Sequence, residues 1–581
     1  MQLKRINIKN FRGIAQSELL FDGHTVLIGD NNAGKSSVFE ALDLVLGPDR
    51  LSRSPVIDEH DFYNGKYYLE GGESPIIEIE VVITLLSPVQ LTRFKNNIEF
   101  WNDMIQDILP EDSIAAVDDE DTFDALRVKF IGRYNEEEDD FEGETYFCSP
   151  PPEDGPLTRF GKMDKRECGF LYLRALRTGN RALSMEKGSL LDIILRLKGI
   201  KPKMWEDVLT ELRSFSVAAD PDLGITGVLT DVQKSLRGFV PTDWGSEPVL
   251  KVSDLTREHL RKTLTIFFAT GLNGYHAPFH HQGTGTINTM VLALLSMIAE
   301  EKHNVIFAME EPEIAIPPYT QKRIVDVLRK KSAQAIFTSH SPFVLEEFSP
   351  ERIILLLRDK NGVQKSKKIH FPKAIKPKTY NSEFRLRFSE SLLAKRVLLT
   401  EGDTEATSYA ASGRKLNELE PEKYNSLEAM GIAVFNVGSD TAIASYGEYF
   451  RSLGKQVFAI FDKQDPDDLV LIEANTDFAY ESKYKGFEKL LIDQTAIEVV
   501  VRFYTSLIED KEWPRHLDKY KVTETDHDGV KKAVMEYLKH SKGSRGAAEL
   551  IGSCTKSVQI AKSIREVFID IKEKTGHEFL C

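Results

Sequence analysis

A glycine-rich stretch near the N-terminus is the strongest structural signal in this sequence. It reads G-x-x-x-x-G-K-S from Gly29 to Ser36, between an apolar run at 26–28 and apolar residues at helical spacing over 38–45. A strand, a tight loop and a helix in this order are the setting in which the motif binds phosphate. A glycine-rich turn that contains a lysine only by chance would not be expected to lie between such a strand and such a helix. We therefore predict a phosphate-binding loop.

The residue types in this loop suit a nucleoside triphosphate. Gly29 and Gly34 let the backbone turn and point its N–H groups inward, and the helix N-terminus adds to the attraction for anions. Lys35 would reach the β- and γ-phosphates, and the Ser36 hydroxyl would ligate Mg²⁺. We predict ATP as the cofactor, with contacts at Gly29, Asn31, Asn32, Gly34, Lys35, Ser36 and Ser37.

Composition and charge narrow the class of protein. A domain size of roughly 100–200 residues predicts about three domains in a chain of 581 residues. The net charge of −15 argues against a protein that coats nucleic acid by bulk attraction, although it leaves room for local basic patches. The sequence has no long uncharged apolar run, no signal-peptide core and no C-x-x-C pair among its four cysteines. We therefore expect a reduced, cytoplasmic protein that does not enter a membrane.

Two later apolar runs end in residues that suit nucleotide hydrolysis. Residues 305–309 read as a buried strand that is followed by an acidic run, Glu310-Glu311-Pro312-Glu313. Residues 335–338 read as another strand, with His340 just beyond it. Carboxylates at the C-terminal end of a buried parallel strand face the ligand crevice. We predict that one of these carboxylates holds Mg²⁺, directly or through water, that the next orients the attacking water, and that His340 senses or stabilises the γ-phosphate.

Three further stretches carry weaker signals. Over residues 180–255 apolar residues recur at helical spacing, which predicts a helical insertion that either pairs with a second copy of the chain or packs on its own domain. The glycine-rich turn at 282–286 precedes a long apolar helix. The lysine-rich stretch from Lys360 to Lys378 reads as loop and linker, either in contact with a phosphate backbone or simply solvated.

A second chemical centre begins at residue 396. The apolar run 396–400 ends in Glu401, and Glu405 follows in a helical pattern. A further apolar run, 457–461, ends in Asp462. In an alternating β/α pattern such strand ends meet at one sheet edge, so we expect Glu401, Glu405 and Asp462 close together. A divalent cation would relieve their repulsion, and oxygen ligands favour Mg²⁺ or Mn²⁺.

The order of the N-terminal motifs resembles the ATP-binding-cassette ATPases of the chromosome-maintenance and RecF-like kind. In those proteins two heads enclose ATP between the phosphate loop of one and the glycine-rich signature of the other, which implies a homodimer. The residues at the signature are then Gly283, Thr284 and Gly285. By the same resemblance Glu310 is the Mg²⁺-side acid, Glu311 the catalytic base and His340 the switch histidine. Relatives often have Leu-His-Pro after the acidic run, whereas residues 314–318 read Ile-Ala-Ile-Pro-Pro, which implies slow or differently gated hydrolysis.

The C-terminal centre resembles the Toprim domain of topoisomerases, primases and some nucleases. A cassette head followed by Toprim resembles the overcoming-lysogenization-defect (OLD) family of bacterial and phage nucleases, and the helical insertion matches the dimerisation insert of part of that family. The resemblance implies metal ligands at Glu401, Glu405, Asp462 and Glu488, and a lysine near the scissile phosphate at Lys542. The family's usual Asp-x-Asp pair reads Asp462-Lys463-Gln464 here, so either Asp465 serves as the second acid or one metal position is weakened.

These observations predict an α/β protein: an ATP-binding-cassette ATPase domain with a helical insertion, then a Toprim domain with C-terminal helices. The predicted domains are 1–179, 180–255, 256–390 and 391–581. The predicted function is an ATP-regulated DNA endonuclease that uses two Mg²⁺ or Mn²⁺ ions and forms a homodimer or larger homo-oligomer, and the resemblance implies anti-phage defence or phage exclusion. Two alternatives stay open: a nucleotide-gated DNA-binding or repair protein, and a subunit that senses a foreign component through ATP and controls a partner effector. Besides DNA, a partner protein or an RNA- or DNA-containing defence component stays open as a partner.

Overall fold

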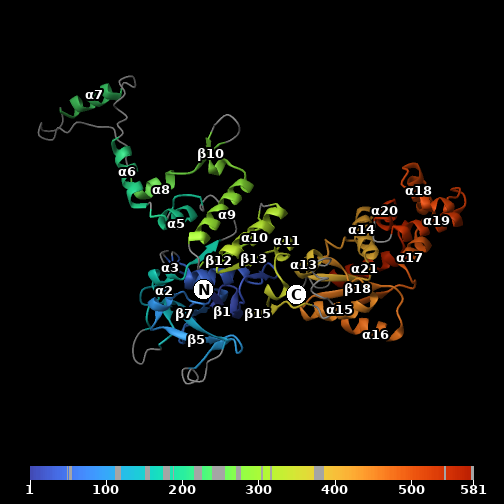
Figure 1. Ribbon diagram of the computed structural model, residues 1–581, viewed down its shortest axis with the longest axis horizontal. Coiled ribbons are helices and arrows are strands. Elements are labelled where there is room, and N and C mark those ends of the chain that lie inside the picture. Colours follow the sequence, from blue (N-terminus) through green and yellow to red (C-terminus); the bar gives the residue numbers. More distant parts are fainter. Residues whose placement is uncertain are drawn as a thin grey trace. The chain divides into compact units, whose positions relative to one another are not determined.

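The chain folds into two units, each built around its own β-sheet (Figure 1). The first unit comprises Met1–Glu347 and Leu356–Ser366, and the second comprises Phe348–Leu355 and Lys367–Cys581. The computed structural model describes residues 1–48, 50, 55–110, 120–150, 157–173, 183–186, 189–199, 201–214, 225–237, 256–269, 276–301, 305–314, 317–371, 385–541 and 545–576.

The first unit has a large mixed sheet with a parallel part. Its parallel strands are β3 (Thr25–Ile28), β9 (Phe170–Leu173), β12 (Ile306–Glu310) and β13 (Gln334–Thr338). β12 pairs with β9 on one side and with β13 on the other, and β13 also pairs with β3. β3 and β13 are buried along their whole length, and β12 up to its last residue. Strands buried on both faces read as continuous apolar runs, and for this reason the sequence marks them clearly.

The rest of the strands of this sheet are mostly antiparallel. They are β1 (Gln2–Phe11), β2 (Ile14–Leu20), β4 (Ile77–Thr84), β5 (Ile98–Asn102), β6 (Asp107–Ile108), β7 (Thr122–Asn135) and β8 (Asp140–Phe147). The order is β6-β5-β7-β4-β1-β2, and β8 pairs with β7. β4 begins with buried residues alternating with half-buried ones, which gives this part of the sheet one apolar and one polar face.

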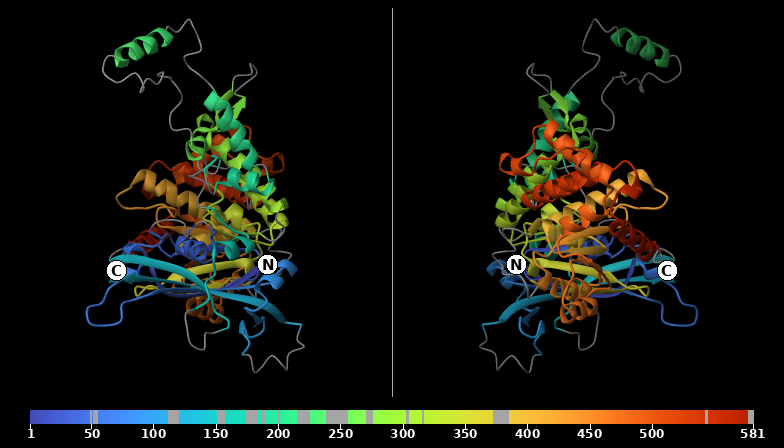
Figure 2. Two further views of the ribbon diagram at one scale, coloured as in Figure 1. Left: turned by 90° about the vertical axis from the view of Figure 1, so that its left-hand side faces the viewer. Right: turned by 90° about the vertical axis from the view of Figure 1, so that its right-hand side faces the viewer.

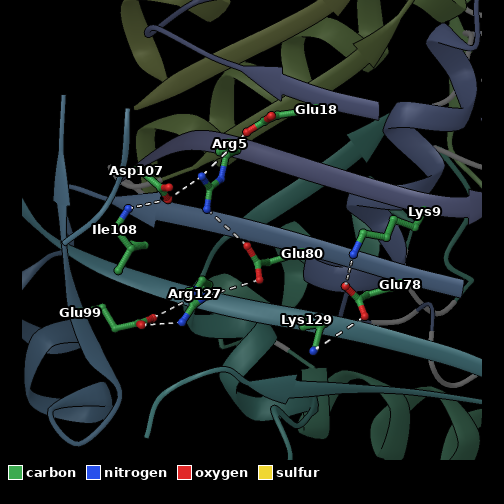
Figure 3. A network of polar contacts seen from close by, with 10 residues as sticks. All are labelled: Arg5, Lys9, Glu18, Glu78, Glu80, Glu99, Asp107, Ile108, Arg127 and Lys129. Carbon is green, nitrogen blue, oxygen red and sulfur yellow. Dashed lines mark hydrogen bonds and ion pairs between the residues drawn. The ribbon is translucent and has the colours of Figure 1, made fainter. Parts of the chain in front are cut away.

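The polar face carries ion pairs that cross from strand to strand (Figure 3). Glu80 lies between two arginines, 3.4 Å from Arg5 Nη2 and 3.6 Å from Arg127 Nη1. Arg127 Nη2 also lies 2.7 Å from Glu99 on β5. Such cross-strand pairs contribute a few tenths of a kcal/mol to about 1 kcal/mol each, and they favour one strand register over a slipped one.

The first unit also contains helices. They are α1 (Lys35–Leu46), α2 (Pro88–Phe94), α3 (Lys162–Glu167), α5 (Leu190–Leu197), α6 (Lys201–Ser214), α7 (Ile225–Arg237), α8 (Arg257–Thr263), α9 (Thr284–Glu301), α10 (Pro318–Lys331) and α11 (Pro342–Leu345). α1 contacts β1, β4, β7 and β9, and α9 contacts α5 and α10. In the turned views of Figure 2 the green helices of this unit lie to one side of its blue strands. Helices α5 to α7 fall within 180–255, and the limits and role of the insertion stay a prediction.

Part of the lysine-rich stretch is a strand, so its interpretation as loop and linker is wrong there. β15 (Val363–Lys368) pairs in parallel with β2, and β14 (Ile353–Arg358) joins it to β3 in the sheet. Gln364 is 3% exposed, whereas Lys365 is exposed. A short strand with lysines on its solvent side has the composition of a loop, and the buried glutamine gave no apolar signal. Residues 372–384 lie outside the described residues.

The second unit is built on four parallel strands in the order β17-β16-β18-β19. They are β16 (Arg396–Thr400), β17 (Ile432–Asn436), β18 (Gln456–Phe461) and β19 (Phe478–Glu481). Thr400 at the end of β16 lies opposite Asn436 and Ile460, so these strands end together at one edge. Side chains that follow these ends are therefore neighbours.

Helices cover this sheet and continue into a helical C-terminal part. They are α13 (Arg385–Leu393), α14 (Asp403–Leu419), α15 (Ile443–Ser452), α16 (Pro466–Asn475), α17 (Phe487–Gln494), α18 (Ile497–Glu509), α19 (His527–His540), α20 (Gly546–Gly552) and α21 (Lys562–Gly576). One buried cluster joins Leu398 and Phe458 of the strands to Leu507 and Phe568 of the C-terminal helices. No helix among the described residues is long and apolar enough to cross a membrane.

Replacing Gly413 by alanine tests the packing of α14 on α21. Gly→Ala inside a helix normally gains about 1 kcal/mol, but a Cβ on Gly413 would lie 2.7 Å from Phe568 Cε1. Overpacking of this kind costs about 1–3 kcal/mol. We expect Gly413→Ala to lower the unfolding temperature of the second unit in calorimetry. Gly552→Ala is the matched control, because a Cβ there meets nothing within 4 Å. An equal or higher unfolding temperature for Gly413→Ala would contradict the packing.

Candidate functional site

The glycine-rich loop has the backbone that its motif requires. β3 leads into Gly29, whose φ is +149°, and Gly34 has a φ of +87° just before α1. A Cβ on Gly29 would lie 2.5 Å from the carbonyl oxygen of Leu356, so no larger residue fits there. The side chains of Asn31, Asn32 and Ser36 are exposed, Ser37 is half-buried, and α1 begins at Lys35.

Lys35 points back into this loop. Its Nζ donates hydrogen bonds to the carbonyl oxygens of Gly29, at 2.7 Å, and Asp30, at 2.9 Å. Burial lowers the pKa of Lys35, and the nearby carboxylates of Glu311, Asp30 and Glu313 oppose that effect. A phosphate would compete with the two carbonyls for the ammonium group, at a place where the acids that follow β12 also act.

Gln364 supports the loop from β15 and was not found from the sequence. Its side-chain Nε2 donates to the carbonyl oxygen of Ala33, and its Oε1 accepts from Ser17 Oγ at 2.6 Å. The same Nε2 lies 2.8 Å from where a Cβ on Gly34 would stand. A glutamine far along the chain carries no local signal of this role, because only the strand pairing brings it to the loop.

The acids and the histidine lie at neighbouring strand ends. Glu310 accepts a hydrogen bond from the Tyr172 hydroxyl at 2.9 Å. Glu311 has a φ of +44°, and its N–H donates to the carbonyl oxygen of Thr338 at 2.9 Å. Burial and the charge of Lys35 lower the pKa of His340, which favours a neutral imidazole. Gly283 and Gly285 stand at the start of α9.

The second unit brings Glu401 and Asp462 together at the edge where β16 and β18 end, as the alternating pattern predicts. The Asp462 N–H donates to Glu401 Oε1 at 2.8 Å, and the Gly486 N–H donates to Asp462 Oδ2 at 2.6 Å. Burial raises the pKa of Glu401 to about 7, and the charges of Asp462, Glu405 and Asp440 add to that rise. A bound cation would reduce the repulsion between carboxylates that lie close together in a half-buried place.

The second acid of the Asp-x-Asp pattern falls at Gln464, with Asp465 next to it, and the structure places these two residues differently. Gln464 Nε2 donates to Glu401 Oε1 at 3.0 Å and to the carbonyl oxygen of Asp462 at 3.1 Å. Its backbone N–H donates to Glu481 Oε1 at 2.9 Å, which fixes the turn after β18. Asp465 is exposed just before α16. An amide group therefore contacts the Glu401 carboxylate and the backbone of Asp462.

The other predicted ligands differ in how they are placed. Glu405 lies in the first turn of α14 with its carboxylate over Gly402, where a Cβ would lie 2.8 Å from Oε2. Glu488 is 7% exposed, and its Oε1 has no hydrogen-bond partner. Asp440 follows β17 and was missed from the sequence, although an acid just beyond a strand end was the available signal. Lys542 lies outside the described residues.

The chemistry of these residues fits a divalent cation, although a full cage is not formed. Within the described ranges, no group of three or more His, Cys, Asp or Glu side chains is arranged to hold a metal ion. The Asp462 N–H nevertheless donates to the Glu401 carboxylate, and the Oε1 of Glu488 is a buried oxygen without a hydrogen-bond partner. Oxygen-only donors of this type suit Mg²⁺ or Mn²⁺.

The raised pKa of Glu401 makes the stability of the protein depend on pH. Because the folded-state pKa, about 7, lies above the ordinary value of 4.5, the contribution of Glu401 to stability is present below about pH 4.5 and is lost as pH rises through 7. In EDTA, we expect Glu401→Gln to raise the unfolding temperature of the second unit at pH 8 more than at pH 5. Glu473→Gln on exposed α16 is the control and should change neither value. An equal effect of Glu401→Gln at both pH values would contradict the shift.

Comparisons with known proteins agree with this arrangement. Residues 1–136 and 221–345 match the family model described as AAA ATPase domain. Residues 392–463 match the model described as overcoming lysogenization defect protein-like, TOPRIM domain. The predicted fold class and family resemblance are thereby confirmed.

Three curated proteins are similar to this chain over most of its length. The Old nuclease of Escherichia phage P2 is 22% identical over 73% of this chain and 72% of its own. The OLD nuclease of Thermus scotoductus is 23% identical over 76% of this chain and 78% of its own. Endonuclease GajA of Bacillus cereus is 20% identical over 73% of this chain and 69% of its own. The chain thus carries an AAA ATPase domain followed by an OLD-like Toprim domain, and it is similar over most of its length to proteins named OLD nucleases.

Proposed function

We propose that this chain is an ATP-regulated, divalent-metal-dependent DNA endonuclease that acts in anti-phage defence or phage exclusion. The observation that carries the proposal is the contact between Glu401 and Asp462 at the carboxyl edge of a parallel sheet, in a chain that also has a phosphate loop. The similarity to proteins named nucleases and endonuclease supports the same activity. DNA is the proposed substrate, and a homodimer or larger homo-oligomer is the proposed assembly.

The acidic edge would perform phosphodiester hydrolysis. Glu401, Asp462, Glu405 and Glu488 would hold two Mg²⁺ or Mn²⁺ ions, which would activate water and offset charge on the leaving oxygen. The Gly486 N–H fixes one oxygen of Asp462, and the Gln464 amide fixes Glu401, so both carboxylates are oriented before substrate arrives. Lys542 would offset negative charge that develops on the phosphate.

The phosphate loop would supply the regulation. Lys35 and Ser36 would bind the phosphates and Mg²⁺ of ATP, and Glu311 would orient the attacking water beside His340. Glu310, which the Tyr172 hydroxyl orients, would stand on the Mg²⁺ side. Gly283, Thr284 and Gly285 would close the site of a second copy, so that the state of the nucleotide controls access of DNA to the acidic edge.

Removing either central acid tests the nuclease assignment. Glu401→Ala and Asp462→Ala should lower Mn²⁺-dependent nicking of supercoiled plasmid by more than the roughly 10–100-fold lost when an outer partner of a metal site is removed. ATP binding, measured with a fluorescent analogue, should be unchanged, because the two acids lie in the second unit. Glu473→Ala on α16 is the control and should nick like the unmodified chain. Normal nicking by the two acid variants would remove the assignment.

The amide at Gln464 favours a second function, a nucleotide-gated DNA-binding protein whose acidic domain only scaffolds. Gln464→Asp adds the carboxylate that the Asp-x-Asp pattern lacks, and we expect it to raise Mn²⁺ affinity in calorimetry by about 10-fold or more. If the unmodified chain does not nick plasmid with any divalent cation while Gln464→Asp does, the scaffold function is correct. If both nick, the nuclease proposal holds.

A further inference from the structure

Two short turns meet where β12 and β13 end. The acidic turn, residues 311–314, follows β12, and the histidine turn, residues 339–341, follows β13. Glu310 lies opposite Thr338 in the strand register, and the Glu311 N–H donates to the Thr338 carbonyl oxygen, so the pairing continues one residue into the acidic turn. This backbone pairing places the two turns side by side, but it does not by itself fix the residues beyond Glu311 and Thr338.

Glu313 is the side chain that connects the two turns. Both of its carboxylate oxygens lie 3.0 Å from Ser339 Oγ, and Oε1 also accepts from the His340 N–H at 2.7 Å. The 2.7 Å bond is short for an N–H donor, as expected when the acceptor is charged. The predicted roles of the acidic run left Glu313 without a role of its own.

The histidine turn is held from other sides as well, so Glu313 completes a continuous set of contacts. The Ser341 N–H donates to Ser339 Oγ at 3.0 Å, and Ser341 Oγ donates to Gln321 Oε1 on α10 at 2.7 Å. The Ser339 N–H donates to the carbonyl oxygen of Leu27 on β3 at 3.3 Å. Ser339 is fully buried. The contacts therefore run from the strand before the phosphate loop, through the histidine turn, to the acidic turn.

We propose that Glu313 is a positioning residue that holds His340 in a fixed place relative to Glu311 and the phosphate loop. The inference rests on the proposed function, because it assigns Glu313 to the ATP hydrolysis step. Glu313 acts through the backbone of His340 and through Ser339, and it does not itself touch the nucleotide. Its carboxylate is one of the charges that act on Lys35, which places it close to the phosphate site.

The hydrogen-bond pattern favours a carboxylate. Ser339 Oγ donates its hydrogen to Glu313 and accepts from the Ser341 N–H, and the His340 N–H also donates to Glu313. A carboxylate supplies an acceptor for both donors. Burial and the charge of Glu311 raise the pKa of Glu313, and its hydrogen bonds with His340 and Ser339 oppose that rise. A glutamine can accept from His340 with its oxygen but turns an NH₂ group towards Ser339, whose hydroxyl hydrogen then loses its acceptor. Glu313→Gln should therefore keep the bond from His340 and lose the acceptor for Ser339, and Glu313→Ala should lose both.

Steady-state ATP hydrolysis by the full chain tests the proposal. We expect Glu313→Ala to lower kcat by about 10–100-fold with KM for ATP changed less than about 3-fold, and Glu313→Gln to lie between it and the unmodified chain. Asp326→Asn removes a half-exposed acid on α10 that pairs with Lys330, and it is the control, which should leave both constants unchanged. A rise in KM at constant kcat would overturn the inference, because it would indicate a role in binding.

A double-mutant cycle separates positioning of His340 from general support of the fold. If Glu313 acts by placing the imidazole, Glu313→Ala should cost almost nothing further in a His340→Ala chain. A full additional loss of kcat in that background would overturn the inference. If Glu313→Ala does not fold, the nearly isosteric Glu313→Gln takes its place in the cycle. An unmodified chain that binds but never hydrolyses ATP would instead contradict the proposed ATPase, which keeps the two failures distinct.

Discussion

Hydrogen bonds between parallel strands determine where the charged groups of both units stand. In the first unit the pairing of β12 with β13 sets Glu310 opposite Thr338, and the acidic and histidine turns start from that level. In the second unit Thr400 lies opposite Ile460, so Glu401, one residue later, and Asp462, two residues later, meet just beyond the strand ends. A shift of one residue in either pair would turn alternate side chains to the other face and separate the acids.

In both sites backbone groups hydrogen-bond to the charged side chain, and burial shifts the pKa of that side chain. Lys35 is surrounded by loop carbonyls, and burial lowers its pKa. Glu401 receives two hydrogen bonds on one oxygen, yet burial and three neighbouring acids raise its pKa to about 7. Ionisable groups whose pKa values are shifted by their surroundings are common at functional sites. A bound anion would stabilise the charged form of Lys35, and a bound cation would stabilise the charged form of Glu401.

The parts of the fold that follow from short-range patterns could be predicted from the sequence. The phosphate loop and the buried strands before Glu310, Glu401 and Asp462 all carry continuous local signals, and the structure has them. β15 was not predicted, because its lysines look like a loop and its burial comes only from pairing with β2.

The parts of the sites that could not be predicted depend on contacts between distant residues. Gln364, Asp440 and Glu313 gain their places from turns and strands that the sequence does not order in space. The acid at Glu313 was visible as part of a run, but its hydrogen bonds to the next strand's turn were not. The choice between Gln464 and Asp465 was left open for the same reason, since a change of one residue in a turn decides which side chain faces Glu401.

The contact of Gln364 with Ala33 has a consequence for how the chain is made. The two residues are 331 positions apart, and β3 also needs β13 as its neighbour. A ribosome therefore releases the phosphate loop long before the segments that shape it exist, and closing so long a loop is slow. The N-terminal half on its own exposes an unpaired sheet edge. The nascent chain therefore needs protection from aggregation until synthesis has passed residue 364.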